Sequence, residues 1–342
     1  MRIILDAMSG DTGCEAAIRG AAEAYARSGT EVTLVGDEAA IRETFVENSV
    51  SMDGINILHA PQVITMEDDP VRAVREKRNS SMSIGLGALK RGEGNAFISS
   101  GNTGALLTGA TLLVGRIPGV RRAALAVMLP SSGDHGALLI DCGANSECTS
   151  EYLIQFALMG SAYMESVCHM ARPRVALISN GTEDHKGNQL TRETHALLRE
   201  LHEAGSLNFC GNIEARDILY DQADVVVCDG FTGNVILKTI EGAGMLLMTK
   251  VREAMTATLT TKLAAAILKP KLQPLKKMTD YRETGATPIL GISKPVFKAH
   301  GASDASAYAN AILFAAEYCA SGIGEKITDQ IMRTRKTKEA VE

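Results

Sequence analysis

Short apolar segments rich in β-branched residues alternate along the chain with longer segments whose apolar residues recur at helical spacing. The short segments predict β-strands at residues 2–6, 31–35, 55–59, 96–99, 124–129, 137–141, 174–179, 207–210 and 224–228. The longer segments predict helices at residues 15–28, 37–46, 70–91, 102–114, 150–169, 188–204, 233–268 (in pieces) and 304–320. This alternation predicts an α/β fold with a mostly parallel sheet covered by helices on both faces.

Two local signals refine this prediction. A short polar turn at residues 131–136 separates two apolar segments and predicts an antiparallel β-hairpin inserted in the sheet. Asp69 and Pro70 predict a helix start, because Asp caps helices and Pro fits the first helical position. Residues 256–281 are the least regular part of the chain, and no Pro- or Gly-rich linker divides the sequence.

Small-residue turns that contain Gly-Asn follow several of the short apolar segments. They are Gly101-Asn102, Gly187-Asn188, Gly211-Asn212 and Gly233-Asn234, and the turn at residues 141–145 has the same character. Open α/β sheets bind ligands at the carboxyl ends of their strands, where helix N-termini attract anions. We therefore expect these turns to hold a small anion such as phosphate.

The composition excludes several classes of protein. The 342 residues carry a formal net charge of −5, which argues against general binding of nucleic acid. The seven cysteines are odd in number and form no C-x-x-C, so we expect reduced core thiols of a cytosolic protein and no structural zinc site. The first residues are typical of a strand rather than a signal peptide, and no apolar run is long enough to span a bilayer.

Several nucleotide and hydrolase motifs are missing from the sequence. There is no G-x-G-x-x-G after the first strand and no G-x-x-x-x-G-K-[ST], which weakens the case for a dehydrogenase or an NTPase. There is also no G-x-S-x-G and no H-E-x-x-H, which argues against a serine hydrolase or a zinc protease.

Two turns in the first third of the chain are candidate binding sites. The turn after the first strand holds Asp6 and Gly10, and it is either a ligand-facing turn or an ordinary turn that needs Gly10 for a positive φ. Ser100, Gly101, Asn102 and Thr103 form either a helix cap or an anion-binding nest, and their density of small polar groups favours the nest.

Lysines and asparagines in the later turns are candidates for chemistry. Lys186 lies in a glycine-flanked turn beside Asn188 and can neutralise phosphate as a point charge. Asn234 follows Asp229 and Gly233 at a helix start and can donate a hydrogen bond to a developing oxyanion. Lys238, one helical turn later, is better explained as a solvated position.

Two further residues are weighed as reactive groups. His300 precedes the last predicted helix and either contacts a ligand or is incidental to a capping loop. Cys142 is interpreted as a core thiol rather than a nucleophile, because the adjacent Asp141 raises a thiol pKa.

Two charged segments are candidate interaction surfaces. In the segment 254–278, Leu259, Leu263 and Ile267 recur at i, i+4 and i+8 among lysines, and Pro270 and Pro274 are predicted to break the helix. This segment either lies on an anionic membrane surface or packs on the body or on a second subunit. The basic cluster Arg72, Arg75, Lys77 and Arg78 either meets an acidic protein or is a solvated helix face, which is the commoner outcome.

In this order, the motifs resemble those of the bacterial acyl-acyl-carrier-protein:phosphate acyltransferases of phospholipid synthesis. The segments that carry the resemblance span nearly the whole chain: LDAMSGD (5–11), SGNTGA (100–105), DCGAN (141–145), QFALMG (155–160), KGN (186–188), GNIEARD (211–217), VVVCDGFTGN (225–234) and HG (300–301). The resemblance implies a Rossmann-like α/β/α sandwich in one catalytic domain, residues 1–342, from which an amphipathic helical segment at 252–281 protrudes.

The resemblance also implies an activity and a set of partners. A fatty acyl group passes from acyl carrier protein to inorganic phosphate, and the resulting acyl phosphate feeds a glycerol-3-phosphate acyltransferase. The family implies a cytoplasmic homodimer without a cofactor or metal, peripherally bound to the cell membrane. The family's active lysine and asparagine correspond to Lys186 and Asn234, and Asn145 and His300 lie in its motifs.

The sequence departs from the family pattern at two turns. Ser9 replaces the usual Gly, Thr12-Gly13-Cys14 replaces Asn-Ala-Pro, and Ser179-Asn180-Gly181-Thr182 replaces a usual Asn-Ile-Gly-Glu. These changes affect the contacts of residues 9–14 and 179–182 and leave Lys186 and Asn234 in place.

The mechanism expected from these residues is a direct attack of phosphate on the thioester without a covalent enzyme intermediate. One alternative is a phosphate acetyltransferase-like enzyme that uses acyl-coenzyme A. The other is a non-catalytic membrane scaffold that binds phosphate.

Overall fold

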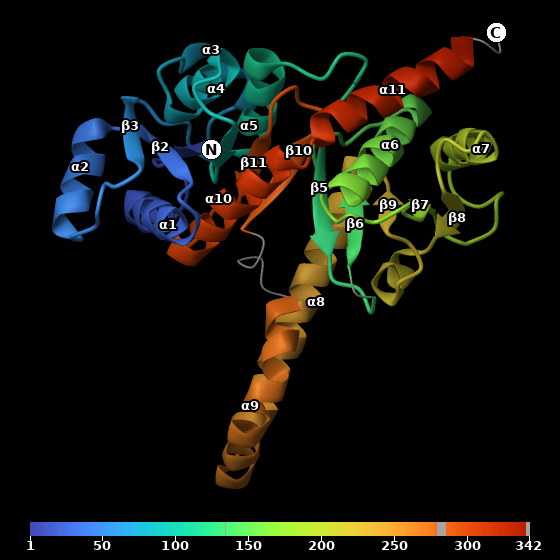
Figure 1. The fold of residues 1–342 in the computed structure, drawn as a ribbon. Helices are drawn as coiled ribbons and strands as arrows, with labels where there is room; N and C mark the ends of the chain where they lie inside the picture. Colours follow the sequence, from blue (N-terminus) through green and yellow to red (C-terminus); the bar gives the residue numbers. More distant parts are fainter. Residues whose placement is uncertain (134, 279–284, 340–342) are drawn as a thin grey trace.

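The computed structural model describes residues 1–133, 135–278 and 285–339. In this part of the chain, eleven strands form one sheet with the order β3-β2-β1-β4-β11-β10-β5-β6-β9-β7-β8 (Figure 1). The strands are β1 (Arg2–Asp6), β2 (Glu31–Gly36), β3 (Ile55–His59), β4 (Ala96–Ser99), β5 (Ala124–Leu129), β6 (Ala137–Ile140), β7 (Val175–Ile178), β8 (Phe209–Ile213), β9 (Val225–Val227), β10 (Ala286–Leu290) and β11 (Val296–Ala299).

The sheet consists of two parallel blocks that run in opposite directions. The first block is β3-β2-β1-β4-β11 and the second is β6-β9-β7-β8. Strands β10 and β5 join the blocks through three antiparallel pairings. The predicted β5–β6 hairpin is therefore confirmed, although residue 134 of its turn lies outside the described residues. Because this hairpin reverses the chain, the strands of the second block end on the side of the sheet where the strands of the first block begin.

Helices cover both faces of the sheet and follow from the alternation of side chains along the strands. Ile3 and Leu5 of β1 belong to one apolar cluster, and Ile4 belongs to the other. The first cluster is covered by α1 (Gly13–Ser28), α2 (Glu38–Glu47), α6 (Ser150–Ser166), α7 (Gln189–Glu203), α10 (Ala305–Ala320) and α11 (Ile323–Glu339). The second is covered by α3 (Pro70–Glu76), α4 (Ser81–Arg91), α5 (Thr103–Gly109), the π-helix η1 (Ala110–Val114), the 3₁₀-helix η2 (Ala215–Tyr220) and the start of α8 (Gly230–Thr256). The predicted mostly parallel sheet with helices on both faces is confirmed.

Several predicted boundaries were wrong. The helix predicted at 70–91 is divided into α3 and α4, because the Ser80 side chain accepts a hydrogen bond from Ser83 N and starts a new helix. Asp69 caps α3 as predicted. Strands β10 and β11 and helix α11 were not predicted; Pro288 in β10 argues against a strand because it cannot donate to a ladder.

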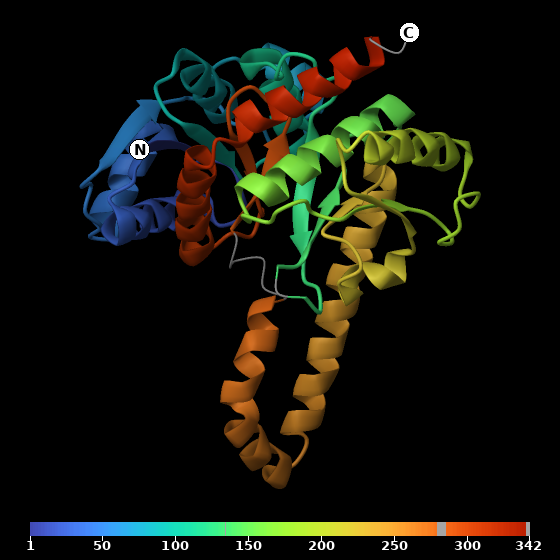
Figure 2. The same ribbon diagram turned by 45° about the vertical axis from the view of Figure 1, so that its right-hand side comes forward.

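Helices α8 and α9 (Leu259–Met278) project together from the sheet (Figures 1 and 2). The prediction that 256–281 is irregular and that Pro270 and Pro274 break the helix was wrong, since α9 continues through both positions. A proline removes one helical hydrogen bond, which bends a helix without always ending it. Residues 279–281 of the predicted segment lie outside the described residues. Among the helices that the structure describes, none has the length and apolar character to cross a membrane.

Candidate active site

The predicted site residues fall into two groups at the carboxyl ends of the two blocks. The turns after β1, β4 and β11 carry the first group: Asp6, Gly10, Ser100, Gly101, Asn102, Thr103 and His300. The turns after β6, β9 and β7 carry the second group: Asn145, Asp229, Gly233, Asn234, Lys186 and Asn188. Helix α8 begins in the second group and runs toward the first.

The first group contains a buried network of polar side chains. Asp6 accepts hydrogen bonds from the Ser9 hydroxyl at 2.6 Å and the Ser99 hydroxyl at 2.8 Å. The Ser100 hydroxyl bonds to the Ser9 carbonyl at 2.6 Å and shares a bond with the Tyr308 hydroxyl at 2.7 Å. The side chains of Asp6 and Ser100 therefore hold these turns together.

Gly10 and Asn102 also serve local structure. Gly10 has a φ of +106°, and a Cβ there would lie 2.6 Å from the Ser100 hydroxyl oxygen. Asn102 caps α5, accepting from Ala105 N at 3.0 Å, and its amide nitrogen donates to the Asp68 carbonyl at 3.2 Å. The predicted contact of Gly101, Asn102 and Thr103 with substrate stays a prediction, and the Asn102 side chain is already engaged.

Sequence reasoning missed Lys298 in β11. Its ammonium donates to the carbonyl oxygens of Ser100, at 3.0 Å, and Ala299. Burial lowers the pKa of Lys298 to about 8, and the carboxylate of Asp11 opposes this shift. The signal available in the sequence was weak, because a lysine in a short apolar segment resembles a solvent-facing strand position.

Helix α8, which begins in the second group, carries a charged residue that acts on the first group. Lys238 pairs with Glu241 at 2.7 Å, and the positive charges of Lys298 and Lys238 act on His300. Burial lowers the pKa of His300, and these two cations lower it further. Lys238, interpreted from the sequence as solvated, is exposed and belongs to this charged cluster.

In the second group, the buried carboxylate of Asp141 organises the turn after β6. It accepts hydrogen bonds from Leu125 N at 3.0 Å, Ala144 N at 3.1 Å and Asn145 N at 2.7 Å. The Asn145 amide also donates to it at 2.9 Å and to the Ala123 carbonyl at 2.8 Å. Burial raises the pKa of Asp141, while these hydrogen bonds oppose the rise. The Asn145 side chain thus fixes the turn.

The start of α8 packs tightly against this turn. Asp229 caps the helix by accepting from Thr232 N at 2.9 Å. A Cβ on Gly233 would lie 1.9 Å from the Asp141 carbonyl oxygen, so only glycine allows this approach. A Cβ on Gly143 would lie 3.7 Å from Cβ of Asn234, which places the Asn234 side chain beside the turn.

Lys186 lies in the turn after β7, the strand adjacent to β9. Asn188 caps α7 by accepting from Thr191 N at 2.8 Å. The Asn212 amide donates to the Glu183 carbonyl at 2.9 Å, and so braces the turn that carries Lys186. Asp184, two residues before Lys186, pairs with Arg199 at 2.7 Å.

Two candidate side chains of the second group, like Thr103 of the first, are unengaged in the part of the chain that the structure describes. Within the described part of the chain, neither the Lys186 ammonium nor the Asn234 amide has a hydrogen-bond or ion-pair partner. Asn102, Asn145, Asn188 and Asn212 all bond to the protein. Lys186 and Asn234 are therefore available to a substrate.

The thiol beside this turn is unsuited to nucleophilic chemistry. Burial raises the pKa of Cys142 far above its usual value, and the charge of Asp141 raises it further. The interpretation of Cys142 as a core thiol is confirmed. Among the described residues, no three His, Cys, Asp or Glu side chains are grouped to hold a metal ion.

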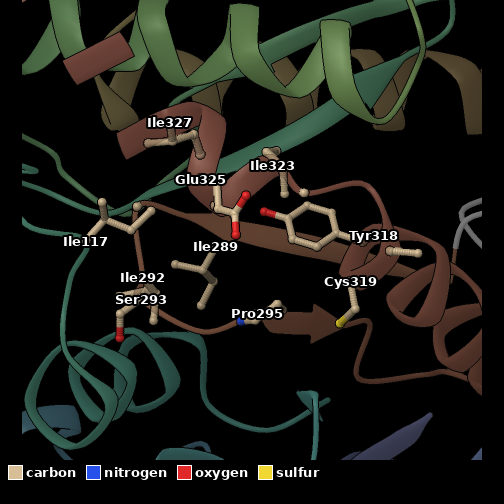
Figure 3. Close-up of a pocket in the computed structure, with 14 residues that line it drawn as sticks. Ile117, Ile289, Ile292, Ser293, Pro295, Tyr318, Cys319, Ile323, Glu325 and Ile327 are labelled. Atoms are coloured by element: carbon tan, nitrogen blue, oxygen red, sulfur yellow. The ribbon is translucent and has the colours of Figure 1, made fainter. Parts of the chain in front are cut away.

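Two cavities of about 290 Å³ each lie in the described part of the protein, one away from these turns and one against the turn after β6. One lies between the β10–β11 turn and the α10–α11 turn, where isoleucines surround Glu325 and Tyr318 (Figure 3). The other lies beside Ala144 and Asn145, between that turn and the helices α3 and α5.

Comparison with known proteins places the chain in a family. Residues 1–326 match the family model described as "Fatty acid synthesis protein". The chain is 47% identical over 335 residues to a phosphate acyltransferase of Geobacillus thermodenitrificans, covering 98% of this chain and 100% of the relative. The chain belongs to the phosphate acyltransferase family. A phosphate acyltransferase of Bacillus subtilis is 46% identical over 340 residues, covering 99% of this chain and 100% of that relative.

A solved structure supports the fold independently. A phosphotransacetylase from Streptococcus pyogenes superposes with a TM-score of 0.64 at 16% identity, covering 94% of each chain. This likeness concerns the α/β architecture. As a member of the phosphate acyltransferase family, the protein is an enzyme of phosphate acyl transfer in fatty acid and phospholipid synthesis.

Proposed function

We propose that this phosphate acyltransferase transfers a fatty acyl group from acyl carrier protein to inorganic phosphate. The observation that carries the assignment of roles is that Lys186 and Asn234 have no partner in the described part of the chain. Lys186 lies in the turn after β7, and Asn234 lies near the start of α8, which follows the adjacent strand β9. Lys186 holds the phosphate, and the Asn234 amide donates to the oxygen of the thioester carbonyl as it becomes an oxyanion.

The reaction needs no protein nucleophile. A phosphate oxygen attacks the thioester carbonyl carbon, and the tetrahedral intermediate expels the carrier thiolate, which takes up the phosphate proton. Phosphate dianion is an adequate nucleophile at neutral pH, so positioning and charge stabilisation suffice. The inert Cys142 thiol agrees with this route. The product is an acyl phosphate, which a glycerol-3-phosphate acyltransferase consumes.

The other predicted site residues are proposed to shape the substrate site. Asn145, Asn188, Asp229 and Gly233 shape the second group of turns around the phosphate, and His300 faces the substrate from the first group together with the cations Lys238 and Lys298. The whole chain acts as one catalytic domain.

A hydroxylamine trap for acyl phosphate tests the function. Purified protein, a long-chain acyl carrier protein thioester and phosphate should give trapped product at a far higher rate than acetyl-coenzyme A does. Preference for acetyl-coenzyme A would favour the acetyltransferase alternative, and no product from folded protein would favour the scaffold.

Two variants test the roles of the residues. Asn234→Asp keeps the shape and removes the N–H donor, so kcat should fall by about 10²–10³-fold. Lys186→Ala should raise KM for phosphate or abolish turnover, whereas the exposed Lys90→Ala should leave it unchanged. Unchanged phosphate kinetics in Lys186→Ala would refute its role.

We also propose that the α8–α9 projection brings the enzyme, as a cytoplasmic homodimer, to the inner face of the membrane. Leu259, Leu263 and Ile267 are 80%, 69% and 78% exposed on α9, beside the exposed Lys262. An apolar stripe next to basic residues suits an anionic lipid surface. Leu263→Glu with Ile267→Glu should abolish flotation with anionic vesicles and leave turnover of the carrier thioester in solution intact. Flotation that survives both changes would refute this contact, and light scattering tests the dimer.

A further inference from the structure

The cavity beside Ala144 and Asn145 has a concentration of positive charge. Three arginines from separate elements line it: Arg75 of α3, Arg116 after η1, and Arg122 before β5. No acidic side chain occurs among its described lining residues. A cavity that gathers cations from three elements without counter-charges is suited to an anion.

Two of the three guanidinium groups are held in place without being neutralised. Arg116 donates to the backbone carbonyl of Arg121, and Arg122 stacks over the ring of Tyr152 with 5.5 Å to the ring centroid. No ion pair joins Arg75, Arg116 or Arg122 to an acid within the described residues. By contrast, the neighbouring Arg121 pairs with Glu151 at 3.0 Å.

The rest of the lining is mostly apolar, with Thr108, Thr111 and Asn145 as its polar members, and it is partly open to solvent. Val71, Leu107 and Leu112 contribute to it, and Val71 and Leu112 are among the exposed apolar residues of the protein. A ligand that fits such a lining combines an anionic group with a slender chain of weakly polar atoms.

The cavity adjoins the proposed reaction centre. Its wall includes Ala144 and Asn145, and the preceding residue, Gly143, lies against the Asn234 side chain. One short turn therefore separates the arginines from the amide that stabilises the oxyanion. An anion bound by the arginines is placed to lead a connected chain to Asn234.

We propose that this cavity binds the phosphopantetheine arm of the acyl donor, with Arg75, Arg116 and Arg122 pairing with the phosphate of the arm. The inference rests on the proposed function and specifies how its donor is recognised. Arginine pairs with phosphate through bidentate, charge-assisted hydrogen bonds, and the apolar lining covers the linear part of the arm. The thioester at the end of the arm then reaches Asn234.

The test compares two small donors that carry the same long acyl chain: acyl-phosphopantetheine and acyl-pantetheine, which lacks the phosphate. The wild-type enzyme should turn over the phosphorylated donor with a kcat/KM higher on the order of tenfold or more. In the double variant Arg75→Ala with Arg122→Ala, this preference should disappear through a raised KM, while acyl-pantetheine is used as before. Both arginines are exposed, so folding should be preserved.

Arg121→Ala is the matched control, because it removes a neighbouring positive charge that is outside the cavity lining and paired with Glu151. It should keep the wild-type preference. A double variant that still prefers the phosphorylated small donor overturns the inference. The inference is also overturned if the double variant loses activity only toward the acyl carrier protein thioester, since the arginines would then contact the surface of the carrier protein rather than the phosphate of the arm. Trapped acyl phosphate with an unchanged preference overturns this inference alone, whereas no product from any donor overturns the proposed function with it.

Discussion

Replacing Lys298 by methionine should change how the stability of the enzyme depends on pH. Burial lowers the pKa of Lys298 from 10.5 to about 8 in the folded state. Below pH 8 the ammonium is charged in both folded and unfolded chains, so the full cost of burying the charge is present. Between pH 8 and 10.5 the folded state loses its proton first, and stability rises with pH.

The size of the effect follows from the shift. A difference of about 2.5 pKa units corresponds to about 3 kcal/mol, and linkage leaves about 2 kcal/mol of this cost at pH 9. The free energy of unfolding of the wild type, relative to Lys298→Met, should therefore rise by roughly 1.3 kcal/mol from pH 7 to pH 9. The hydrogen bonds from Lys298 to Ser100 and Ala299 are already included in its folded-state pKa and need no separate contribution to this difference.

Urea denaturation of both proteins at pH 7, 8 and 9 measures this quantity directly. Comparing the two proteins removes the pH dependence that they share. A difference in unfolding free energy that stays constant within about 0.3 kcal/mol across this range would refute the assignment of a buried, weakly basic lysine.

Two substitutions probe the packing of α8 on the turn after β6. Gly233→Ala forces a Cβ to within 1.9 Å of the Asp141 carbonyl oxygen and should destabilise the protein by about 1–3 kcal/mol and displace Asn234, lowering kcat at least tenfold. Gly242 lies on the same helix, and a Cβ there would have no neighbouring atom within 4 Å, so Gly242→Ala should stabilise the protein by about 0.5–1 kcal/mol. Equal shifts of the unfolding temperature in Gly233→Ala and Gly242→Ala would contradict this account. Asp141→Asn places an N–H₂ group against the N–H donors of Asn145 and should cost about 2–4 kcal/mol, measured as a lower unfolding temperature; an unchanged value would show that the carboxylate is already protonated in the folded state.

Local patterns in the sequence were sufficient for most of the sheet. Strands β1, β4, β5 and β6 and the reversal between β5 and β6 follow from apolar runs and one polar turn. Strand β10 was missed because Pro288 argues against a strand in the local sequence. The segment becomes a strand by pairing with β5, which is far away in sequence.

The candidate site also depends on contacts between residues that are far apart in sequence. The Gly-Asn turns were located from sequence, yet their roles depend on partners that the sequence does not display. Asn102 and Asn234 each follow a glycine at a helix start, but the Asn102 amide meets carbonyl groups, those of residues 65, 66 and 68, whereas Asn234 has no such partner among the described residues. Lys298 was missed because its contact with the turn at Ser100 arises only in the fold, and the arginine cavity was missed because three separate elements build it.

The position of β10 and β11 in the middle of the sheet has a consequence for synthesis of the protein. These strands come from residues 286–299, yet they pair with β5 and β4 and join the two blocks. Until the ribosome has released this late segment, each block has an open strand edge, and unpaired edges are templates for aggregation. The nascent chain must therefore keep two half-sheets apart from the time β9 (Val225–Val227) completes the second block until residues 286–299 emerge, and the enzyme becomes whole only when its last sixth inserts between them.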